Sequence, residues 1–164
     1  MSDLRNRFLE LEGATIIENT TTLSAVKQQL IKKCKEHCSY SYSPYSHFSV
    51  GAALLLDSGE IIGGSNQENA SYPLCMCAEK TAFGAASSFY PNTAIISVAV
   101  TAFKKGKFVD DPISPCGSCR QFIAEYAHRY NQPIEVIMYG TNFTVSFDTI
   151  YRLLPVTFQA TDFQ

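Results

Sequence analysis

Residues 95–101, Ile-Ile-Ser-Val-Ala-Val-Thr, form a nearly continuous run of apolar and β-branched residues. A run without the alternation of a half-exposed strand is typical of a strand that is buried on both faces. Helices are predicted before and after it, over residues 77–88 and 117–129, the first rich in alanine and ended by Pro91. A buried strand between two helices indicates a sheet with helices packed against it.

The rest of the chain extends this arrangement. A helix is predicted to begin after Ser24, a suitable N-cap, because apolar residues recur three or four positions apart from there to Cys38. Strands are predicted over residues 48–56, 61–65, 134–139 and 143–147, and a last helical turn over residues 149–154. The sequence therefore predicts an α/β fold, a three-layer α-β-α sandwich with a mixed sheet of about five strands.

Length and composition predict one folded domain. The chain has 164 residues, of which 46% are apolar, so a sizeable core can be buried. Only 17% are charged, which favours an oligomer because less of the surface is strongly hydrated. Residues 1–22 have neither a helical nor a strand period, so we interpret them as an extension that is loosely docked or mobile. The domain itself is expected to span residues 23–164.

The charge pattern excludes several classes of partner. The net charge is −2 and the pI about 5.9, so no global positive field attracts nucleic acid or an anionic membrane. No apolar run approaches the roughly 18 residues of a membrane span, and the N-terminus lacks the apolar core of a signal peptide. We therefore expect a cytoplasmic protein, in which six cysteines serve as metal ligands, catalytic groups or core residues instead of disulfides.

Two cysteine motifs indicate a metal site. Cys77-Ala-Glu79 opens one predicted helix, and Pro115-Cys116-Gly-Ser-Cys119 opens the next. Helices on either side of one strand can bring these three thiols to a single ion. Three thiolates suit zinc, and three protein ligands leave a fourth position for water, as in catalytic zinc sites. Helix N-termini also lower thiol pKa values, which favours metal binding.

Other interpretations of these cysteines stay open. Cys75 could close a structural site of four cysteines, although positions i and i+2 seldom bind one tetrahedral ion well. Cys116 and Cys119 could form a redox dithiol. Cys34 and Cys38 have metal-pair spacing, but they continue an apolar helical stripe, which favours core packing.

Charged residues flank the predicted zinc site. Glu79 lies in the first turn of a helix, where a carboxylate is stabilised, and beside a metal-activated water it is a candidate proton carrier. Zinc with three thiolates has a formal charge of −1, so a nearby cation should balance the thiolates. Lys80 and Arg120 are the candidates, although both could be ordinary surface cations.

The order of these motifs resembles the zinc-dependent deaminases, in which a His or Cys ligand is followed by x-Glu and later by Pro-Cys-x-x-Cys. From about Ser24 onward the chain is similar to the cytidine deaminases, specifically the small homotetrameric type. Five ordered motifs carry the resemblance: Ser43-Pro-Tyr-Ser-His-Phe-Ser-Val-Gly-Ala-Ala-Leu, Asn66-Gln-Glu-Asn-Ala-Ser-Tyr-Pro-Leu, Cys77-Ala-Glu-Lys-Thr-Ala, Ser114-Pro-Cys-Gly-Ser-Cys-Arg-Gln and Leu153-Leu-Pro-x-x-Phe158.

The resemblance implies an activity and an assembly. The activity is the hydrolytic removal of the 4-amino group from cytidine and deoxycytidine, giving uridine and deoxyuridine with release of ammonia, a step of pyrimidine salvage. One Zn²⁺ per chain and a homotetramer with shared sites are implied. A nucleic-acid editor would need a basic channel, which this acidic chain does not indicate. A deaminase of antibiotic nucleoside analogues, a structural zinc module and a thiol redox protein would each account for part of the cysteine pattern.

The resemblance also assigns residues. Cys77, Cys116 and Cys119 resemble the zinc ligands and Glu79 the proton shuttle. The substrate-binding set that it implies is Phe48 packing on the pyrimidine, Asn66 and Glu68 on the ribose 3′-hydroxyl, Ala78 on the base, and Ala70, Tyr72 and Phe158 completing a neighbouring subunit's site. The chain departs from the family at Lys80, where arginine is common, at Cys75, usually glycine, and in a longer 104–111 loop.

Overall fold

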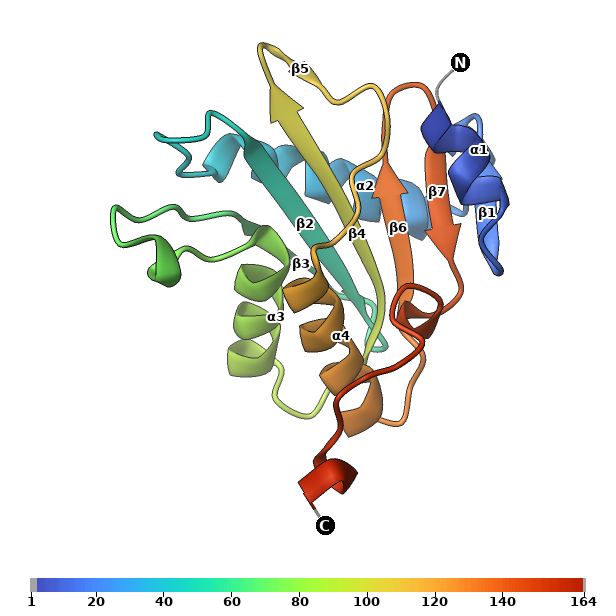
Figure 1. Ribbon diagram of the computed structural model, residues 1–164, viewed down its shortest axis with the longest axis vertical. Coiled ribbons are helices and arrows are strands. Elements are labelled where there is room, and N and C mark those ends of the chain that lie inside the picture. Colours follow the sequence, from blue (N-terminus) through green and yellow to red (C-terminus); the bar gives the residue numbers. More distant parts are fainter. Residues whose placement is uncertain (1–2, 164) are drawn as a thin grey trace.

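The computed structural model describes residues 3–163 of the chain (Figure 1). Its sheet has the strand order β1-β7-β6-β4-β2-β3, with a short β5 paired to β4. All pairs are antiparallel except β4 with β6, so the sheet is mixed as predicted. The strands are β1 Ala14–Ile17, β2 Ser49–Leu56, β3 Ile61–Ser65, β4 Ile95–Lys104, β5 Lys107–Phe108, β6 Glu135–Tyr139 and β7 Thr144–Phe147. The helices are α1 Asp3–Leu9, α2 Ala25–His37, α3 Ala78–Phe89 and α4 Gly117–Arg129.

Helices cover both faces of this sheet, which confirms the three-layer prediction. The larger core cluster joins α3 and α4 to one face through residues such as Phe83 and Ile123. The smaller cluster joins α2 to the other face through Leu30, Ile31 and Cys34. Figure 1 shows α2 behind the sheet and α3 with α4 in front of it. Within residues 3–163, no helix has the length and apolar character needed to cross a membrane.

Strand directions gather several chain segments at one end of the sheet. β3 and β4 both end there, while β2, which is antiparallel to both, begins there. The helices α3 and α4 follow β3 and β4 in the sequence, so their N-terminal ends lie at the same end. In open sheets with helical crossovers, ligands bind at this end of the strands.

Gly64 lets α3 come close to the sheet. A Cβ at this position would lie 2.4 Å from the Ala82 nitrogen and 2.6 Å from the Ala78 carbonyl oxygen. Both distances are shorter than side chains tolerate, so only glycine allows the helix to pack directly on the last residues of β3. This contact fixes the first turn of α3, which carries Glu79.

The N-terminal segment differs from the sequence-based prediction. Residues 1–22 were expected to lack a helix and a strand, but α1 and β1 lie within them. Phe8 is buried, with its ring 6.4 Å from that of Phe143 and 6.5 Å from that of Phe147. β1 pairs with β7. Four residues are too few to give a recognisable strand period, so pairing with the sheet edge determines this strand.

The strand count differs for the same reason. The sheet has seven strands where about five were predicted, and the two additional strands are β1 and the two-residue β5. By contrast, α4 begins and ends where predicted, and α3 and the strand β3 agree to within one residue. Cys34 and Cys38 are both buried, and the Cys34 thiol donates to the Gly51 carbonyl at 3.1 Å. Their interpretation as core residues is confirmed.

Candidate active site

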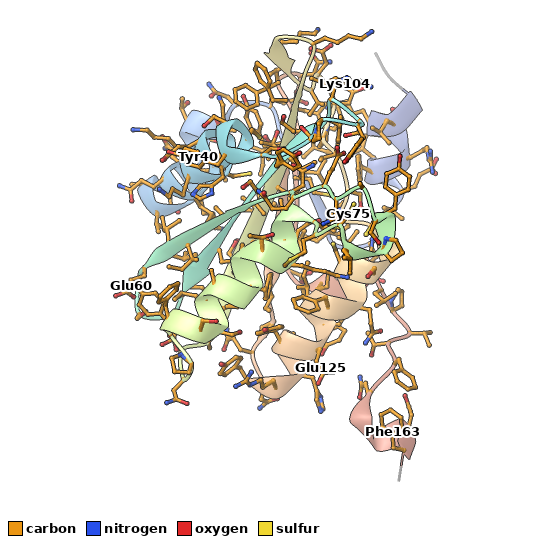
Figure 2. All side chains as sticks on the ribbon, turned by 90° about the vertical axis from the view of Figure 1, so that its left-hand side faces the viewer. Tyr40, Glu60, Cys75, Lys104, Glu125 and Phe163 are labelled. Carbon is orange, nitrogen blue, oxygen red and sulfur yellow. The ribbon has the colours of Figure 1, made fainter. Side chains whose placement is uncertain are left out.

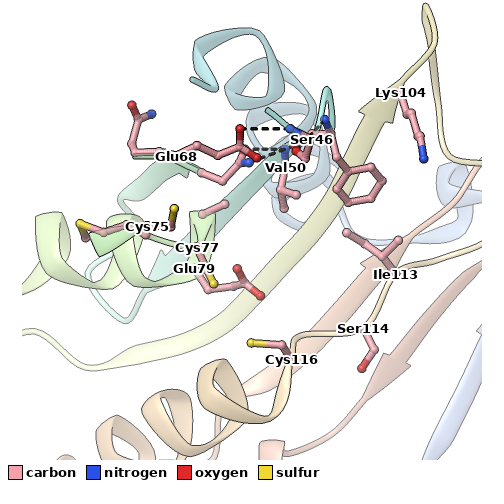
Figure 3. A pocket seen from close by; sticks show the side chains of 15 residues that line it. Ser46, Val50, Glu68, Cys75, Cys77, Glu79, Lys104, Ile113, Ser114 and Cys116 are labelled. Carbon is pink, nitrogen blue, oxygen red and sulfur yellow. Dashed lines mark hydrogen bonds between the residues drawn. The ribbon is translucent and has the colours of Figure 1, made fainter. Parts of the chain in front are cut away.

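A cavity of about 590 Å³ opens at the end of the sheet where α3 and α4 begin (Figure 3). Its volume lies within the range of small-molecule sites. The lining comes from the start of β2, the 66–77 loop, the first turn of α3, the end of β4 and the loop before α4. Glu79, Cys77 and Cys116 lie close together in Figure 3, with Glu68 and Ser46 along another wall.

The three cysteines of the two motifs meet beside this cavity, which Cys77 and Cys116 line and behind which Cys119 is buried. Cys77 is the N-cap residue of α3, Cys116 is the N-cap residue of α4, and Cys119 lies in the first turn of α4. Their sulfurs all lie within 4.8 Å of one another. A tetrahedral zinc ion with Zn–S bonds of roughly 2.3 Å would hold its sulfurs about 3.8 Å apart. The donor set therefore fits zinc with only small movements.

Cys75 does not join this group. Its sulfur instead accepts a hydrogen bond from the Asn69 backbone N–H at 3.2 Å, within the 66–77 loop. Among the described residues, Cys77, Cys116 and Cys119 form the only cluster of metal-binding side chains. A closed site of four cysteines is therefore not what the geometry provides.

The thiols interact strongly with one another. A hydrogen bond from Cys119 lowers the pKa of Cys77 to about 6, opposed by burial and by Glu79, and assisted by Cys116 and Lys80. The donating thiol of Cys119 has its own pKa raised, first by that bond and then by burial. One thiol is thus readily ionised at neutral pH, which is the state that a metal ion binds.

Glu79 is the buried carboxyl group of the site. It is 4% exposed, lines the cavity and belongs to the first turn of α3. Burial raises its pKa, because a carboxylate is poorly solvated there. A carboxyl group that can hold a proton beside three thiols suits general acid–base catalysis.

The two predicted cations take different positions. The Lys80 ammonium donates to the Ser118 hydroxyl at 2.9 Å, and its charge lowers the pKa values of both Cys77 and Glu79. The Arg120 guanidinium donates to three oxygens, those of the Pro115 carbonyl, the Leu153 carbonyl and the Ser114 hydroxyl. Arg120 therefore holds the loop before α4 to the C-terminal segment, and its influence on the thiolates stays a prediction.

Phe48 and Ala78 lie at the cavity as the resemblance implied. Phe48 is half-buried just before β2, and Ala78 is fully buried at the start of α3. The Lys104 ammonium lies 5.7 Å from the centre of the Phe48 ring. This places a cation on one face of the aromatic ring.

Asn66 and Glu68 also line the cavity, but both bind the chain itself. Asn66 lies directly after β3, and its side chain bonds to the backbone on either side of Ser49. One oxygen of Glu68 accepts backbone N–H bonds from Tyr45 at 2.9 Å and Ser46 at 3.3 Å. A hydrogen bond from the Ser46 side chain, and then those from the Tyr45 and Ser46 backbone, lower the pKa of Glu68, so it is ionised at neutral pH.

Three predicted residues do not reach this cavity. Ala70 is exposed, Tyr72 is 70% exposed with its ring centre 6.0 Å from that of Tyr45, and Phe158 is 59% exposed. The backbone of Phe158 is bound to the Gln121 side chain on α4. Figures 1 and 2 show the C-terminal segment running away from the β5 end of the molecule. Their roles in a neighbouring subunit stay predictions.

Other lining residues were not singled out from the sequence. Lys104 is the last residue of β4, and the sequence singled out the 104–111 loop only for its length. Small and apolar lining residues carry no chemical pattern of their own. The lining residues missed in this way are Ser46, Val50, Gln67, Met76, Lys104, Ile113 and Ser114.

Comparisons with known proteins agree with this site. Residues 24–131 match the family described as "Cytidine and deoxycytidylate deaminase zinc-binding region". The chain is 40% identical to a cytidine deaminase of Halalkalibacterium halodurans over 83% of its own length and 96% of the relative's. It is 38% identical to one from Sporosarcina psychrophila, over 82% and 93%.

A solved structure agrees as well. The crystal structure of cytidine deaminase from Burkholderia pseudomallei superimposes with a TM-score of 0.67 at 34% identity, covering 83% of this chain and all of that one. The matched region includes all three cysteines and Glu79. The chain therefore belongs to the cytidine and deoxycytidylate deaminase zinc-binding family.

Proposed function

We propose that this protein is a zinc-dependent cytidine deaminase, which converts cytidine and deoxycytidine to uridine and deoxyuridine with release of ammonia. The observation that carries the proposal is the meeting of three cysteine sulfurs and the buried Glu79 at one cavity of nucleoside size. The close relatives, themselves named cytidine deaminases, support the choice of substrate.

Glu79 would move the protons of the reaction. When bound by Cys77, Cys116 and Cys119, zinc would supply Lewis-acid activation of the attacking water. The Glu79 carboxylate would accept a proton from that water and deliver it to the pyrimidine ring nitrogen next to the reacting carbon. The remaining hydroxide would add to the reacting carbon. The Glu79 carboxylate would then take the proton of this new hydroxyl group and give it to the amine, which leaves as ammonia while the carbonyl forms, so that one residue acts as base and as acid.

The cavity walls would orient the nucleoside. We propose that Phe48 packs on the pyrimidine ring and excludes water, and that the backbone of Ala78 binds the base. Asn66 and Glu68 would bind the ribose 3′-hydroxyl, an ionised carboxylate being a strong acceptor for it. Each of these residues lines the cavity, which supports the assignment.

We further propose a homotetramer with shared sites. A group of apolar and aromatic side chains is exposed near the cavity mouth, and burial against a neighbouring subunit would remove this area from water. These exposed residues are Tyr42, Tyr45, Tyr72, Leu74 and Met76. Ala70, Tyr72 and Phe158 would contribute to a neighbour's site.

We also propose that residues 23–164 are the catalytic domain and that residues 1–22 are an extension that adds an edge strand. The enzyme would act in cytoplasmic pyrimidine salvage.

The test is a cytidine deamination assay with zinc analysis on the same sample. We expect turnover of cytidine, about one zinc per chain and little action on a cytosine-containing oligonucleotide. Preference for the oligonucleotide would indicate a nucleic-acid editor, and zinc without turnover would indicate a structural module. Sedimentation should give four times the 18.1 kDa of one chain. An active monomer would leave Tyr72 and Phe158 without their proposed role.

A further inference from the structure

Asn66 connects three stretches of chain at the cavity. Its side-chain oxygen accepts hydrogen bonds from the Ser41 hydroxyl at 2.6 Å and from the Val50 backbone N–H at 2.7 Å. Its side-chain nitrogen donates to the Phe48 carbonyl at 3.0 Å. In addition, its backbone N–H donates to the Val50 carbonyl at 3.2 Å. Most of the hydrogen-bonding capacity of this residue is therefore directed at the backbone that carries Phe48.

The side-chain amide of Asn66 keeps one N–H donor that can bind a ligand. An asparagine side chain accepts two hydrogen bonds at its oxygen and donates two from its nitrogen. Here both acceptor positions and one N–H are used within the chain. Asn66 can thus hold Phe48 and still donate its second N–H to a sugar hydroxyl in the cavity.

Glu68 has the same two-sided arrangement. One carboxylate oxygen accepts the Tyr45 and Ser46 N–H groups, three and two residues before Phe48. Figure 3 shows Glu68 beside Ser46. Within the described residues, both backbone N–H groups that bind Glu68 use this one oxygen and none uses the other. This oxygen can therefore accept a bond from a ligand while the first one holds the turn.

The turn between these contacts has a backbone that needs support. His47 has a φ of 52°, in the left-handed region that residues with a Cβ seldom occupy. Such a conformation persists where the surrounding structure holds it. Glu68 accepts hydrogen bonds from the residues before His47, and the Asn66 side chain binds residues after it. Together these contacts fix the path of the chain into Phe48.

We propose that Asn66 and Glu68 are positioning residues for Phe48, and that this role is separable from any contact with the sugar. The proposal rests on the proposed function only in that Phe48 then packs on the pyrimidine. Loss of either side chain should weaken the binding of the base even when the ligand has no 3′-hydroxyl to bind.

The first test needs no substrate. Amide hydrogen exchange of Val50 and Tyr45 is measured in the zinc-loaded protein, for wild type, Asn66→Ala, Glu68→Ala and Ser65→Ala. Ser65 is the matched control, since it lies next to Asn66 and its hydroxyl donates to Tyr40 instead of the Phe48 segment. We expect at least tenfold faster exchange of Val50 in Asn66→Ala and of Tyr45 in Glu68→Ala, with Ser65→Ala near wild type. Unchanged exchange in both variants would overturn the proposal.

The second test separates positioning from sugar binding. Steady-state kinetics are compared on cytidine and on 3′-deoxycytidine, which differ only in the 3′-hydroxyl. If the two residues position Phe48, KM should rise at least tenfold in Asn66→Ala on both substrates. Glu68→Ala should also raise KM, and Glu68→Gln, which keeps an acceptor oxygen, should restore most of the wild-type KM. A loss confined to cytidine would show that the two residues act through the sugar alone.

Two further comparisons complete the design. If Asn66→Ala does not fold, Asn66→Asp takes its place. The aspartate keeps an oxygen for the Ser41 and Val50 bonds but puts an oxygen in place of the N–H that faces the Phe48 carbonyl. The same rise in KM on both substrates is expected. A wild-type protein without turnover of cytidine would overturn the proposed function, whereas the exchange experiment would still decide the positioning role.

Discussion

The Lys80 ammonium donates a hydrogen bond of 2.9 Å to the Ser118 hydroxyl, which joins the first turn of α3 to the first turn of α4. Cys77 caps α3 and Cys116 caps α4, and both are proposed zinc ligands. The bond therefore holds a positive charge between the two helix ends that supply the thiols. The charge of Lys80 lowers the pKa of Cys77 through space, so it acts without a hydrogen bond to the sulfur.

We expect Lys80→Met to weaken zinc binding by about 10–100-fold, the range found when groups that support metal ligands are removed. Methionine keeps much of the side-chain length but removes the charge that favours the thiolates. Ser118→Ala is the matched control, because it removes the hydrogen bond and leaves the charge, and we expect a smaller effect. Competition with a chelating zinc indicator measures both, and equal affinities of Lys80→Met and wild type would contradict the role of the charge.

Cys75→Ala should leave the zinc content at one per chain, whereas Cys116→Ala should lower it sharply. The reason is geometric, since the Cys75 sulfur is bonded to the Asn69 backbone and lies outside the three-sulfur cluster. Metal analysis of the purified variants measures the outcome. An empty site in Cys75→Ala would mean that the site is closed by four cysteines.

Glu79→Gln should retain zinc and lose roughly 10²–10⁴-fold in kcat, the usual contribution of a general acid–base. Glutamine keeps the shape and the burial of the side chain but cannot carry the proton. Turnover rates are to be compared at equal zinc occupancy. Near-normal turnover would remove Glu79 from the chemistry.

The enzyme should accept nucleosides and reject both free cytosine and cytidine monophosphate. A charge-assisted bond from a sugar hydroxyl to Glu68 contributes roughly 1.5–3 kcal/mol, and the free base cannot form it. A nucleotide adds about two negative charges near this ionised carboxylate. Values of kcat/KM for the three compounds decide the point. Since Lys104 lies at the cavity, Lys104→Met in parallel would reveal whether that cation gives a nucleotide any residual activity.

Phe8→Ala should lower the free energy of unfolding by about 3 kcal/mol, the lower end for removal of a buried aromatic ring. Phe8 packs against Phe143 and Phe147 at the β7 side of the sheet, while the cavity lies at α3 and α4. We therefore expect kcat and KM to change less than twofold. Denaturant unfolding measures the stability change, and an unchanged midpoint would mean that α1 is not docked in solution.

The parts of this fold that were predictable have strong local patterns. α4 begins at a Pro-Cys-Gly stretch and has a clear apolar period, and both of its ends agree with the prediction. β4 is a long apolar run that begins at Ile95 as predicted, but it continues beyond the predicted end at Thr101 to Lys104. β1 and β5 are two to four residues long and form because a neighbouring strand offers free backbone groups. The presence of these free backbone groups depends on the folded sheet, so no pattern within β1 or β5 predicts the strand.

The residues of the site also fall into a group that the sequence predicts and a group that only the folded chain reveals. Cys77, Glu79 and Cys116 belong to short motifs whose chemistry can be read from residue types and spacing. The hydrogen bonds of Asn66 depend instead on where β2 and β3 lie relative to each other, which is a property of the folded sheet. Tyr72 and Phe158 depend on contacts beyond a single chain, and one chain leaves them exposed.

The cysteines that we propose as zinc ligands come from two helices that are separate in the sequence, with Cys77 at α3 and Cys116 and Cys119 at α4. An ion that binds the folded chain in preference to the unfolded one shifts the folding equilibrium, by about 1.4 kcal/mol for each tenfold rise in its free concentration above the dissociation constant. Zinc binding at these cysteines would couple the lifetime and abundance of this protein in a cell to zinc supply. Metal scarcity would lower the number of folded molecules as well as the activity of each.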